Sequence, residues 1–314
     1  MPTAAVLSPH LDDAAFSCGG LMARLADADW QVVHATLFAA TVPDPSGFAL
    51  RCQLDKGIGA DVDYMALRRD EDRVFAEQVG ASNVVHGPFP EAPHRGYSSP
   101  DALFGPIRDD DSVVNPLCGY LRALLREHKP DLLALPQAIG GHVDHVQLVN
   151  AVGRMESLDT CPPLVWYRDA PYVIEHLGAH SPFPRVRKCS PLAVDVEPVL
   201  RQKLNGAAAY ESQLGRQFAR RFSDRDWASA ESQPASSRGG ATPKEDRDAE
   251  HAIMRRALTY LAHEEARRIQ GDAGGASSQG SLSNREGVPS AVERFRGNAD
   301  AAGRLDALLL RTHR

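Results

Sequence analysis

The chain has 314 residues and a formal net charge of −6, with 35 basic and 41 acidic side chains. A hydrophobic share of 43% and a charged share of 24% are ordinary for a protein that buries a core in water, and they exclude fibrous and wholly disordered classes. The acidic balance argues against nucleic acid as a partner, because proteins that bind the phosphate backbone concentrate positive charge.

Neither a membrane span nor a secretory signal is visible in the sequence. No run approaches 18 apolar residues, and the N-terminus lacks a basic start followed by a continuous apolar stretch. The five cysteines are odd in number, scattered and never spaced as CxxC, so neither a disulfide framework nor a cysteine zinc site is indicated. We expect a cytoplasmic protein with reduced cysteines.

The first half of the chain alternates between predicted strands and helices. An apolar strand ends at Ser8, a helix follows over 21–28, and a second strand covers 31–38. The pattern continues with helices over 64–79, 113–128 and 146–157, and with strands over 83–86 and 131–136. Because such βαβ units build parallel sheets, we expect an α/β, Rossmann-like fold with a mostly parallel sheet flanked by helices.

The rest of the chain is less regular. Strands are predicted over 163–173 and 191–196, and a helix over 197–214. A charged helix is predicted over 244–268, where an apolar stripe that includes Ile253 and Leu258 favours packing on the core over binding a partner. The stretches 39–62, 87–112 and 214–293 read mostly as long loops around the active site, and we expect them to set substrate specificity.

Polar clusters follow two of the predicted strands, where ligands bind in parallel sheets. They are His10, Asp12 and Asp13 after the first strand, and His142, Asp144 and His145 after the strand over 131–136. A hydrolytic zinc site takes three ligands of the His/Asp/Glu kind and leaves one position for water. The clusters together therefore predict a metal site. The alternative is that the carboxylates cap the following helix and the histidines are ordinary loop residues.

Two motifs carry a family resemblance: Ser8-Pro9-His10-Leu11-Asp12-Asp13 with Cys18-Gly19-Gly20, and Gly141-His142-Val143-Asp144-His145. Weaker landmarks are Arg68-x-x-Glu71, Lys203, Tyr210-x-Ser212-Gln213 and Glu293-x-Phe295. In these features the chain resembles the zinc-dependent de-N-acetylases of the PIG-L (LmbE-like) family. The resemblance implies a single domain over 1–314, one Zn²⁺ per chain, and hydrolysis of an N-acetyl group on an N-acetylglucosamine-type sugar or glycoconjugate.

Carried over by motif position, the resemblance assigns roles to five residues. It makes His10, Asp13 and His145 the zinc ligands. It makes Asp12 the general base that takes a proton from water, and His142 the general acid or the group that stabilises the oxyanion. This division agrees with the chemistry of adjacent residues after a strand, since their side chains point in different directions.

Two further residues have alternative roles. Arg68 matches a family position that contacts substrate, and its alternative is a surface pair with Glu71. Asp144 is predicted either to accept a hydrogen bond from His142 or His145, as carboxylates beside metal-bound imidazoles do, or to cap the helix that follows.

The first motif departs from its commonest form, His-Pro-Asp-Asp-Glu, at Leu11 and Ala14. Neither departure removes a predicted ligand, although Ala14 deletes an outer carboxylate that could hold one in place. Two other functions fit the same sequence. A metal-dependent amidase acting on another small amide would use the same site, whereas a non-catalytic sugar- or nucleotide-binding protein would need no zinc. The chain has neither GxGxxG nor GxxxxGK[ST] to favour the latter.

Overall fold

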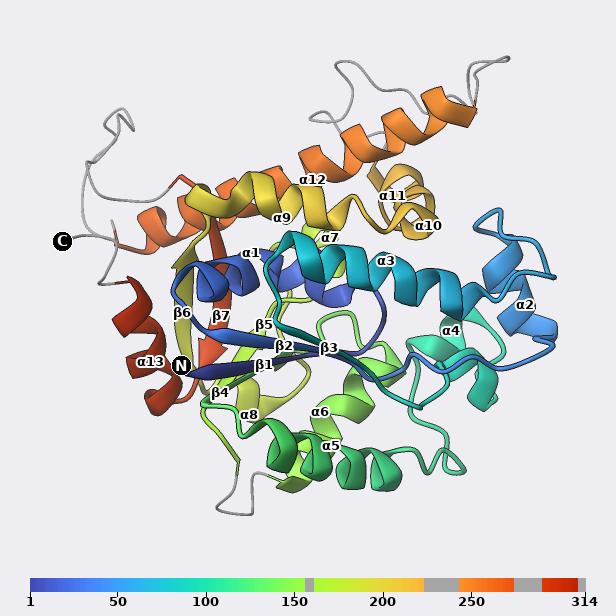
Figure 1. The fold of residues 1–314 in the computed structure, drawn as a ribbon, viewed down its shortest axis with the longest axis horizontal. Helices are drawn as coiled ribbons and strands as arrows, with labels where there is room; N and C mark the ends of the chain where they lie inside the picture. Colours follow the sequence, from blue (N-terminus) through green and yellow to red (C-terminus); the bar gives the residue numbers. More distant parts are fainter. Residues whose placement is uncertain (156–160, 223–242, 274–289, 310–314) are drawn as a thin grey trace.

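The computed structural model describes residues 1–155, 161–222, 243–273 and 290–309. They form a seven-stranded sheet in the order β3-β2-β1-β4-β5-β7-β6 (Figure 1). The strands are β1 (Thr3–Ser8), β2 (Gln31–Thr36), β3 (Asn83–His86), β4 (Leu132–Pro136), β5 (Leu164–Tyr167), β6 (Ser190–Asp195) and β7 (Val292–Gly297). The first five are parallel, and β7 runs antiparallel to both β5 and β6. The predicted α/β, Rossmann-like class is confirmed.

Helices cover both faces of this sheet (Figure 1). One face carries α1 (Asp13–Asp27), α3 (Tyr64–Gln78), α9 (Leu200–Ala207) and α12 (Pro243–Ala273), and the other carries α5 (Val114–His128), α6 (Val143–Met155) and α8 (Pro184–Arg187). The shorter elements are α2 (Gly47–Leu54), η1 (Ala92–Arg95), α4 (Pro100–Leu103), α7 (Tyr172–Glu175), η2 (Glu197–Val199), α10 (Glu211–Leu214), η3 (Gly215–Ala219) and α11 (Arg220–Phe222), and α13 (Ala299–Leu309) follows β7.

The central strand β1 is buried on both faces, which is why it reads as a continuous apolar run rather than an alternating one. Ala4 and Val6 pack into the core under α1 and α3, while Ala5 and Leu7 pack into the core on the α5 and α6 side. The strand order reverses between β1 and β4, where open α/β sheets bind their ligands.

The N-terminal helix α1 is bent, and Glu293 of strand β7 contacts the helix at the bend. Cys18 has non-helical backbone angles (φ −137°, ψ 21°), so helix geometry restarts after it. The freed N–H groups of Gly20 and Leu21 donate to the Glu293 carboxylate on β7 at 2.9 and 2.8 Å, and Lys203 neutralises that buried carboxylate. A Cβ at Gly20 would lie 2.7 Å from Glu293 Oε1, so this contact requires glycine.

Several expectations about individual elements need correction. The strand predicted over 163–173 ends at Tyr167, and the helix predicted over 197–214 is broken at the non-helical Tyr210. The stretch 39–62 contains helix α2. Strand β7 was not predicted because three of its residues are charged. One of them, Glu293, is buried together with Lys203, and the sequence alone does not reveal this pairing.

Helix α12 packs on the core as predicted. Ile253, Ala257, Leu258 and Ala262 of its apolar stripe are buried. Much of the stretch 214–293, which is expected to form loops, lies outside the described residues, namely 223–242 and 274–289. Among the helices that the structure describes, none combines the length and apolarity that crossing a membrane requires.

Candidate active site

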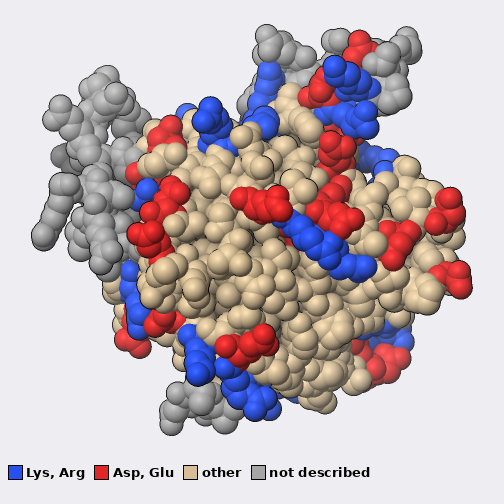
Figure 2. Space-filling model, viewed as in Figure 1, with Lys and Arg blue, Asp and Glu red and all other residues tan. Residues whose placement is uncertain are grey.

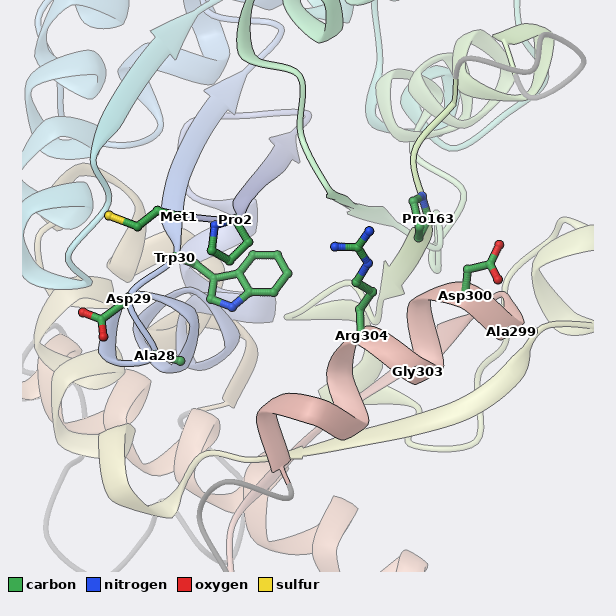
Figure 3. Close-up of a pocket in the computed structure, with 10 residues that line it drawn as sticks. All are labelled: Met1, Pro2, Ala28, Asp29, Trp30, Pro163, Ala299, Asp300, Gly303 and Arg304. Atoms are coloured by element: carbon green, nitrogen blue, oxygen red, sulfur yellow. The ribbon is translucent and has the colours of Figure 1, made fainter.

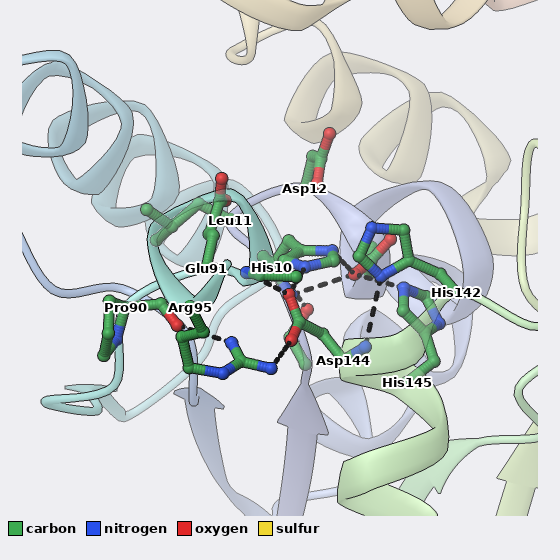
Figure 4. Close-up of polar contacts among 12 residues, drawn as sticks. His10, Leu11, Asp12, Pro90, Glu91, Arg95, His142, Asp144 and His145 are labelled. Carbon is green, nitrogen blue, oxygen red and sulfur yellow. Dashed lines mark hydrogen bonds and ion pairs between the residues drawn. The ribbon is translucent and has the colours of Figure 1, made fainter. Parts of the chain in front are cut away.

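The two predicted motifs meet at the carboxyl ends of β1 and β4 (Figure 4). Asp13 Oδ2 lies 3.1 Å from His10 Nδ1 and 3.1 Å from His145 Nε2. His142 lies at the same place, with its ring centroid 4.8 Å from that of His10 and 5.6 Å from that of His145. The sequence therefore located correctly which segments converge, although 134 residues separate His10 from Asp144.

The turn after β1 leaves the Asp12 carboxylate free of local hydrogen bonds, while Asp13 Oδ2 accepts one from the His10 N–H at 2.9 Å. Ser8 Oγ accepts a hydrogen bond from the Ala14 N–H at 3.0 Å, so the hydroxyl satisfies the start of α1. Asp12 makes no such bond with its side chain, and its backbone has a φ of 153°, which is a strained value for a residue other than glycine. The capping alternative therefore fails for Asp12.

The loop before α6 turns tightly and places His142 at the site. Ala138, Gly140 and Gly141 all have positive φ. At Gly140 an added Cβ would lie 2.7 Å from the Tyr172 ring, so glycine lets the loop pass close to this side chain. The Asp144 N–H then donates to His142 Nδ1 at 3.2 Å. A neutral His142 with this bond carries its proton on Nε2.

The two histidines that flank Asp13 are each held by a second carboxylate. His10 Nε2 donates to Asp144 Oδ2 at 2.9 Å, and His145 Nδ1 donates to Asp169 Oδ1 at 2.7 Å. Metal-bound imidazoles characteristically donate their other N–H to a carboxylate in this way. Both rings thus hold their other nitrogen, Nδ1 of His10 and Nε2 of His145, toward Asp13 Oδ2.

The same groups fit a zinc ion. Ligand atoms that share a tetrahedral zinc at about 2.0–2.1 Å lie about 3.3 Å apart, close to the spacing found around Asp13 Oδ2. His145 Nε2 is buried yet makes no hydrogen bond. His10, His142 and His145 also offer ligand atoms within 4.8 Å of one another. The Asp144 N–H on His142 Nδ1 favours Asp13 over His142 as the third ligand, because a protonated Nε2 cannot bind a metal.

Asp12 stands apart from these ligands as a buried and largely unpaired carboxylate. Its Oδ2 has no hydrogen-bond partner, and its Oδ1 lies 3.5 Å from Arg68 Nη2. Burial raises the pKa of Asp12 to about 7, against the lowering effect of the Arg68 charge. Burial also lowers the pKa of His142 to about 3, so its imidazole is neutral. In this geometry Asp12 can accept a proton and His142 can donate a hydrogen bond.

Arg68 and Asp144 take contacts that the sequence did not predict. Arg68 is 2% exposed and donates to the Leu11 carbonyl at 2.9 Å and to Glu91, so the alternative of a surface pair with Glu71 is wrong. Asp144 holds His10 rather than His142 or His145, because α6 points its side chain across to the end of β1.

Three functional positions were missed by sequence reasoning. Asp169 follows β5 at the same edge of the sheet as the two motifs, and only its assignment to an overlong strand concealed it. Arg95 donates to Asp144 Oδ1 at 2.7 Å, and Glu91 bonds Arg68. The last two lie in the irregular stretch 87–112, where no periodicity indicates which side chains turn inward.

Two cavities differ in their relation to this site. The larger, of about 860 Å³, is lined by Met1, Trp30 and Arg304 among others and lies at the amino ends of the strands (Figure 3). It is therefore at the opposite edge of the sheet from the histidines. The smaller, of about 340 Å³, has Tyr64 and Glu91 in its wall and adjoins Arg68.

Comparison with known proteins places these motifs in a family. Residues 5–155 match the PIG-L family, described as GlcNAc-PI de-N-acetylase. A 2'-N-acetylparomamine deacetylase of Streptomyces fradiae is 32% identical over 232 residues, which cover 71% of this chain and 80% of that protein.

Solved structures share the fold. The zinc-inhibited form of a teicoplanin deacetylase superposes with a TM-score of 0.65 at 20% identity, covering 94% of this chain and 97% of that one. The deacetylase of the antimicrobial A40926 pseudoaglycone gives a TM-score of 0.64 at 22% identity, covering 94% and 96%. With the motifs, the sheet and the Streptomyces relative in agreement, the chain belongs to the PIG-L family.

Proposed function

We propose that this protein is a zinc-dependent hydrolase that removes an N-acetyl group from an N-acetylglucosamine-type sugar or glycoconjugate. The observation that carries the proposal is the pair of 3.1 Å contacts from Asp13 Oδ2 to His10 Nδ1 and His145 Nε2, beside the buried and unpartnered Asp12 Oδ2. In this proposal His10, Asp13 and His145 hold the metal.

The chain's own residues supply the proton transfers and the hydrogen bonds of the reaction. When bound, zinc acts as a Lewis acid that polarises an amide carbonyl and acidifies a water molecule. Asp12 would take a proton from a water molecule beside it as the water oxygen adds to the carbonyl carbon. His142 donates its Nε2–H to the negative oxygen that develops. The C–N bond then breaks, and the proton held at Asp12 passes to the departing nitrogen, which gives acetate and a free amine.

Arg68 sets the position and charge of the proposed base. It donates to the Leu11 carbonyl beside Asp12 and lies over the Tyr64 ring at 5.3 Å, so it is fixed from both sides. Its buried position and its ion pair with Glu91 make it a support for Asp12, and the direct substrate contact that the family resemblance implies stays a prediction.

The choice of substrate rests on the relatives. The Streptomyces fradiae protein is named for an N-acetylated substrate, 2'-N-acetylparomamine, which supports an N-acetylated sugar or glycoconjugate here. The identity of the physiological metal, one Zn²⁺ per chain, a single domain over 1–314 and a cytoplasmic location remain predictions.

Metal content and acetate release, measured on the same tag-free samples, test the proposal. We expect about one zinc per wild-type chain, and loss of the metal in Asp13→Ala and in His145→Ala. Asp12→Asn should keep the metal and the fold while losing at least a hundredfold of acetate release from N-acetylglucosamine-type substrates, as removal of a general base does.

The other outcomes separate the alternatives. Metal without acetate release would favour an amidase acting on another small amide, and a wild type that binds no metal would favour a binding protein. Because a related deacetylase is known in a zinc-inhibited form, zinc should be titrated from below to well above one equivalent. Activity that rises to one equivalent and then falls would still support the proposal.

A further inference from the structure

The segment 87–112, which joins β3 to α5, contacts the carboxylate that holds the proposed ligand His10. The Ala92 N–H donates to Asp144 Oδ2 at 3.0 Å, the same oxygen that accepts from His10. The Arg95 guanidinium donates to the other oxygen, Oδ1, at 2.7 Å (Figure 4). Both oxygens of Asp144 therefore accept hydrogen bonds, and the segment supplies a donor to each of them.

Arg95 is itself held firmly by its own surroundings. Its Nε and Nη2 donate to the two oxygens of Asp111 at 3.2 and 3.0 Å, and its Nη1 donates to the Pro90 carbonyl at 2.8 Å. The guanidinium also lies over the Phe38 ring, with its Cζ 5.0 Å from the ring centroid. Asp111 is held in turn by the Tyr97 hydroxyl, which donates to it at 2.9 Å. Because the guanidinium is a rigid planar fork, these contacts fix its orientation.

The pairing of Arg95 with Asp144 is buried, whereas many charged side chains of the molecule lie on its surface. Figure 2 shows basic and acidic side chains in small mixed groups on one face, and exposed pairs of this kind contribute little to stability. The side chain of Asp144 is fully buried and that of Arg95 is 10% exposed. Asp111 and Asp144 both accept from Arg95 Nη2, so they lie close together and would repel each other without it.

We propose that Arg95 is a positioning residue for the metal ligand His10, which it orients through Asp144, and that metal binding and the closed conformation of the segment 87–112 stabilise each other. The inference rests on the proposed function, because it takes His10 as a ligand of the metal. The coupling is reciprocal by thermodynamic necessity. If the closed segment raises metal affinity by some factor, the bound metal disfavours local opening of the segment by the same factor.

Two possible effects of Arg95 on the metal have opposite signs. As a positive charge near the site, Arg95 repels a metal cation, so its loss would raise zinc affinity. As the support of Asp144, it keeps His10 in the orientation for binding, so its loss would lower zinc affinity. The second effect should be the larger one, because the charge of Arg95 is already balanced by the carboxylates of Asp111 and Asp144.

Zinc affinity, measured by competition with a chelator, tests the proposal in Arg95→Met and Arg95→Lys. Met removes the charge and the donors, whereas Lys keeps the charge but lacks the planar fork that serves both carboxylates. The matched control is Arg108→Met. Arg108 lies in the same segment and donates to Asp110 from Nε and Nη2 at 2.9 and 2.7 Å, but this pair is exposed.

We expect Arg95→Met to lower zinc affinity about three- to tenfold, with the far-UV circular dichroism unchanged. Groups that bond a metal ligand directly are worth about 10- to 100-fold, and Arg95 acts one bond further out. Arg95→Lys should fall between Arg95→Met and the wild type, and Arg108→Met should match the wild type. A rise in zinc affinity in Arg95→Met would show that only its charge matters and would overturn the proposal.

A double-variant cycle with Asp144→Asn distinguishes positioning from a general weakening of the fold. If Arg95 acts on His10 through Asp144, Arg95→Met should cost little further zinc affinity once Asp144→Asn is present. If Arg95 merely supported the fold, the two losses would add. Fully additive losses of zinc affinity would therefore overturn the proposal.

Hydrogen exchange measures the reciprocal effect without using catalysis. Zinc should slow exchange of the Ala92 amide and its neighbours in η1, and this slowing should be smaller in Arg95→Met by about the factor lost in zinc affinity. Slowing that depends on Arg95 would support the inference even if no acetate is released and the proposed function fails. Equal slowing in Arg95→Met and in a wild type that releases acetate would overturn the inference and leave the hydrolase standing.

Discussion

Substitution of Asp169 by Asn tests whether His145 is a metal ligand held by its carboxylate. Asp169 uses one oxygen for each of two donors: His145 Nδ1 at 2.7 Å and the Ile139 N–H at 2.9 Å. An Asn side chain has the same shape but a single acceptor oxygen. If that oxygen keeps Ile139, the amide N–H₂ faces His145 Nδ1 and drives the imidazole proton to Nε2, the nitrogen that faces Asp13.

The expected loss follows from this change of tautomer. Removal of a carboxylate that orients a metal-bound imidazole typically costs 10- to 100-fold in metal affinity, or about 1.4–2.7 kcal/mol. We expect a loss in this range for Asp169→Asn when zinc affinity is measured by competition with a chromophoric chelator, with the far-UV circular dichroism unchanged. Asp131→Asn is the matched control, since Asp131 also accepts a backbone N–H, that of Thr3 at 3.0 Å, but at the opposite edge of the sheet. A folded Asp169→Asn protein with the zinc affinity of the wild type would refute this assignment of His145.

Three further predictions concern the supports of the site. Lys203→Met should lower the thermal midpoint by several degrees, because removing one partner of a buried ion pair costs about 3–5 kcal/mol. Adding Glu293→Gln should restore part of this loss, and fully additive losses in thermal unfolding would contradict the pairing. Gly20→Ala should destabilise by about 1–3 kcal/mol in denaturant unfolding because its Cβ would meet Glu293 and Val196, whereas Gly119→Ala, with open space at an exposed position of α5, should stabilise slightly. Burial raises the pKa of Asp72, but its contacts with His34, His86 and Tyr210 lower that pKa overall. The Asp72 carboxylate therefore stabilises the fold above about pH 4, and this contribution fades as the pH falls further. The thermal midpoints of wild type and Asp72→Asn should therefore differ most above about pH 4 and converge toward pH 2, and a constant difference would argue against this role.

The convergence of the two motifs was predictable because it follows from topology. The order of strands and helices predicts a parallel sheet, and parallel neighbours such as β1 and β4 end at the same edge. The proximity of His10 and His145 could therefore be predicted without any distance information. The contacts of these histidines with carboxylates do not follow from the topology. Which carboxylate would hold which histidine depends on where the α6 helix turns each side chain, and this was assigned wrongly for Asp144.

Contacts that join distant segments were the least predictable. Spacing on a helix allows an Arg68 and Glu71 surface pair as the alternative to a substrate contact. In the structure, α3 buries Arg68 against Leu11, while Glu71 accepts hydrogen bonds from the backbone and hydroxyl of Ser212. A local pattern cannot show that a helix face is covered by a segment more than a hundred residues away. The same limit concealed β7, whose charges look exposed until Lys203 is placed beside Glu293.

The architecture implies that the two halves of the chain depend on each other at the site. The match to the PIG-L family ends at residue 155 and contains the proposed ligands and the proposed base. The groups that keep them in place come from beyond that point: Asp169 holds His145, and Glu293 with Lys203 closes the bend in α1, whose first turn carries Asp13. Helix α1 carries Asp13 before its bend at Cys18 and packs into the core after it. The contacts that support the bend are therefore coupled to the position of Asp13 at the metal site. Substitutions on β7 should therefore change metal affinity as well as stability, although no β7 residue lies at the site.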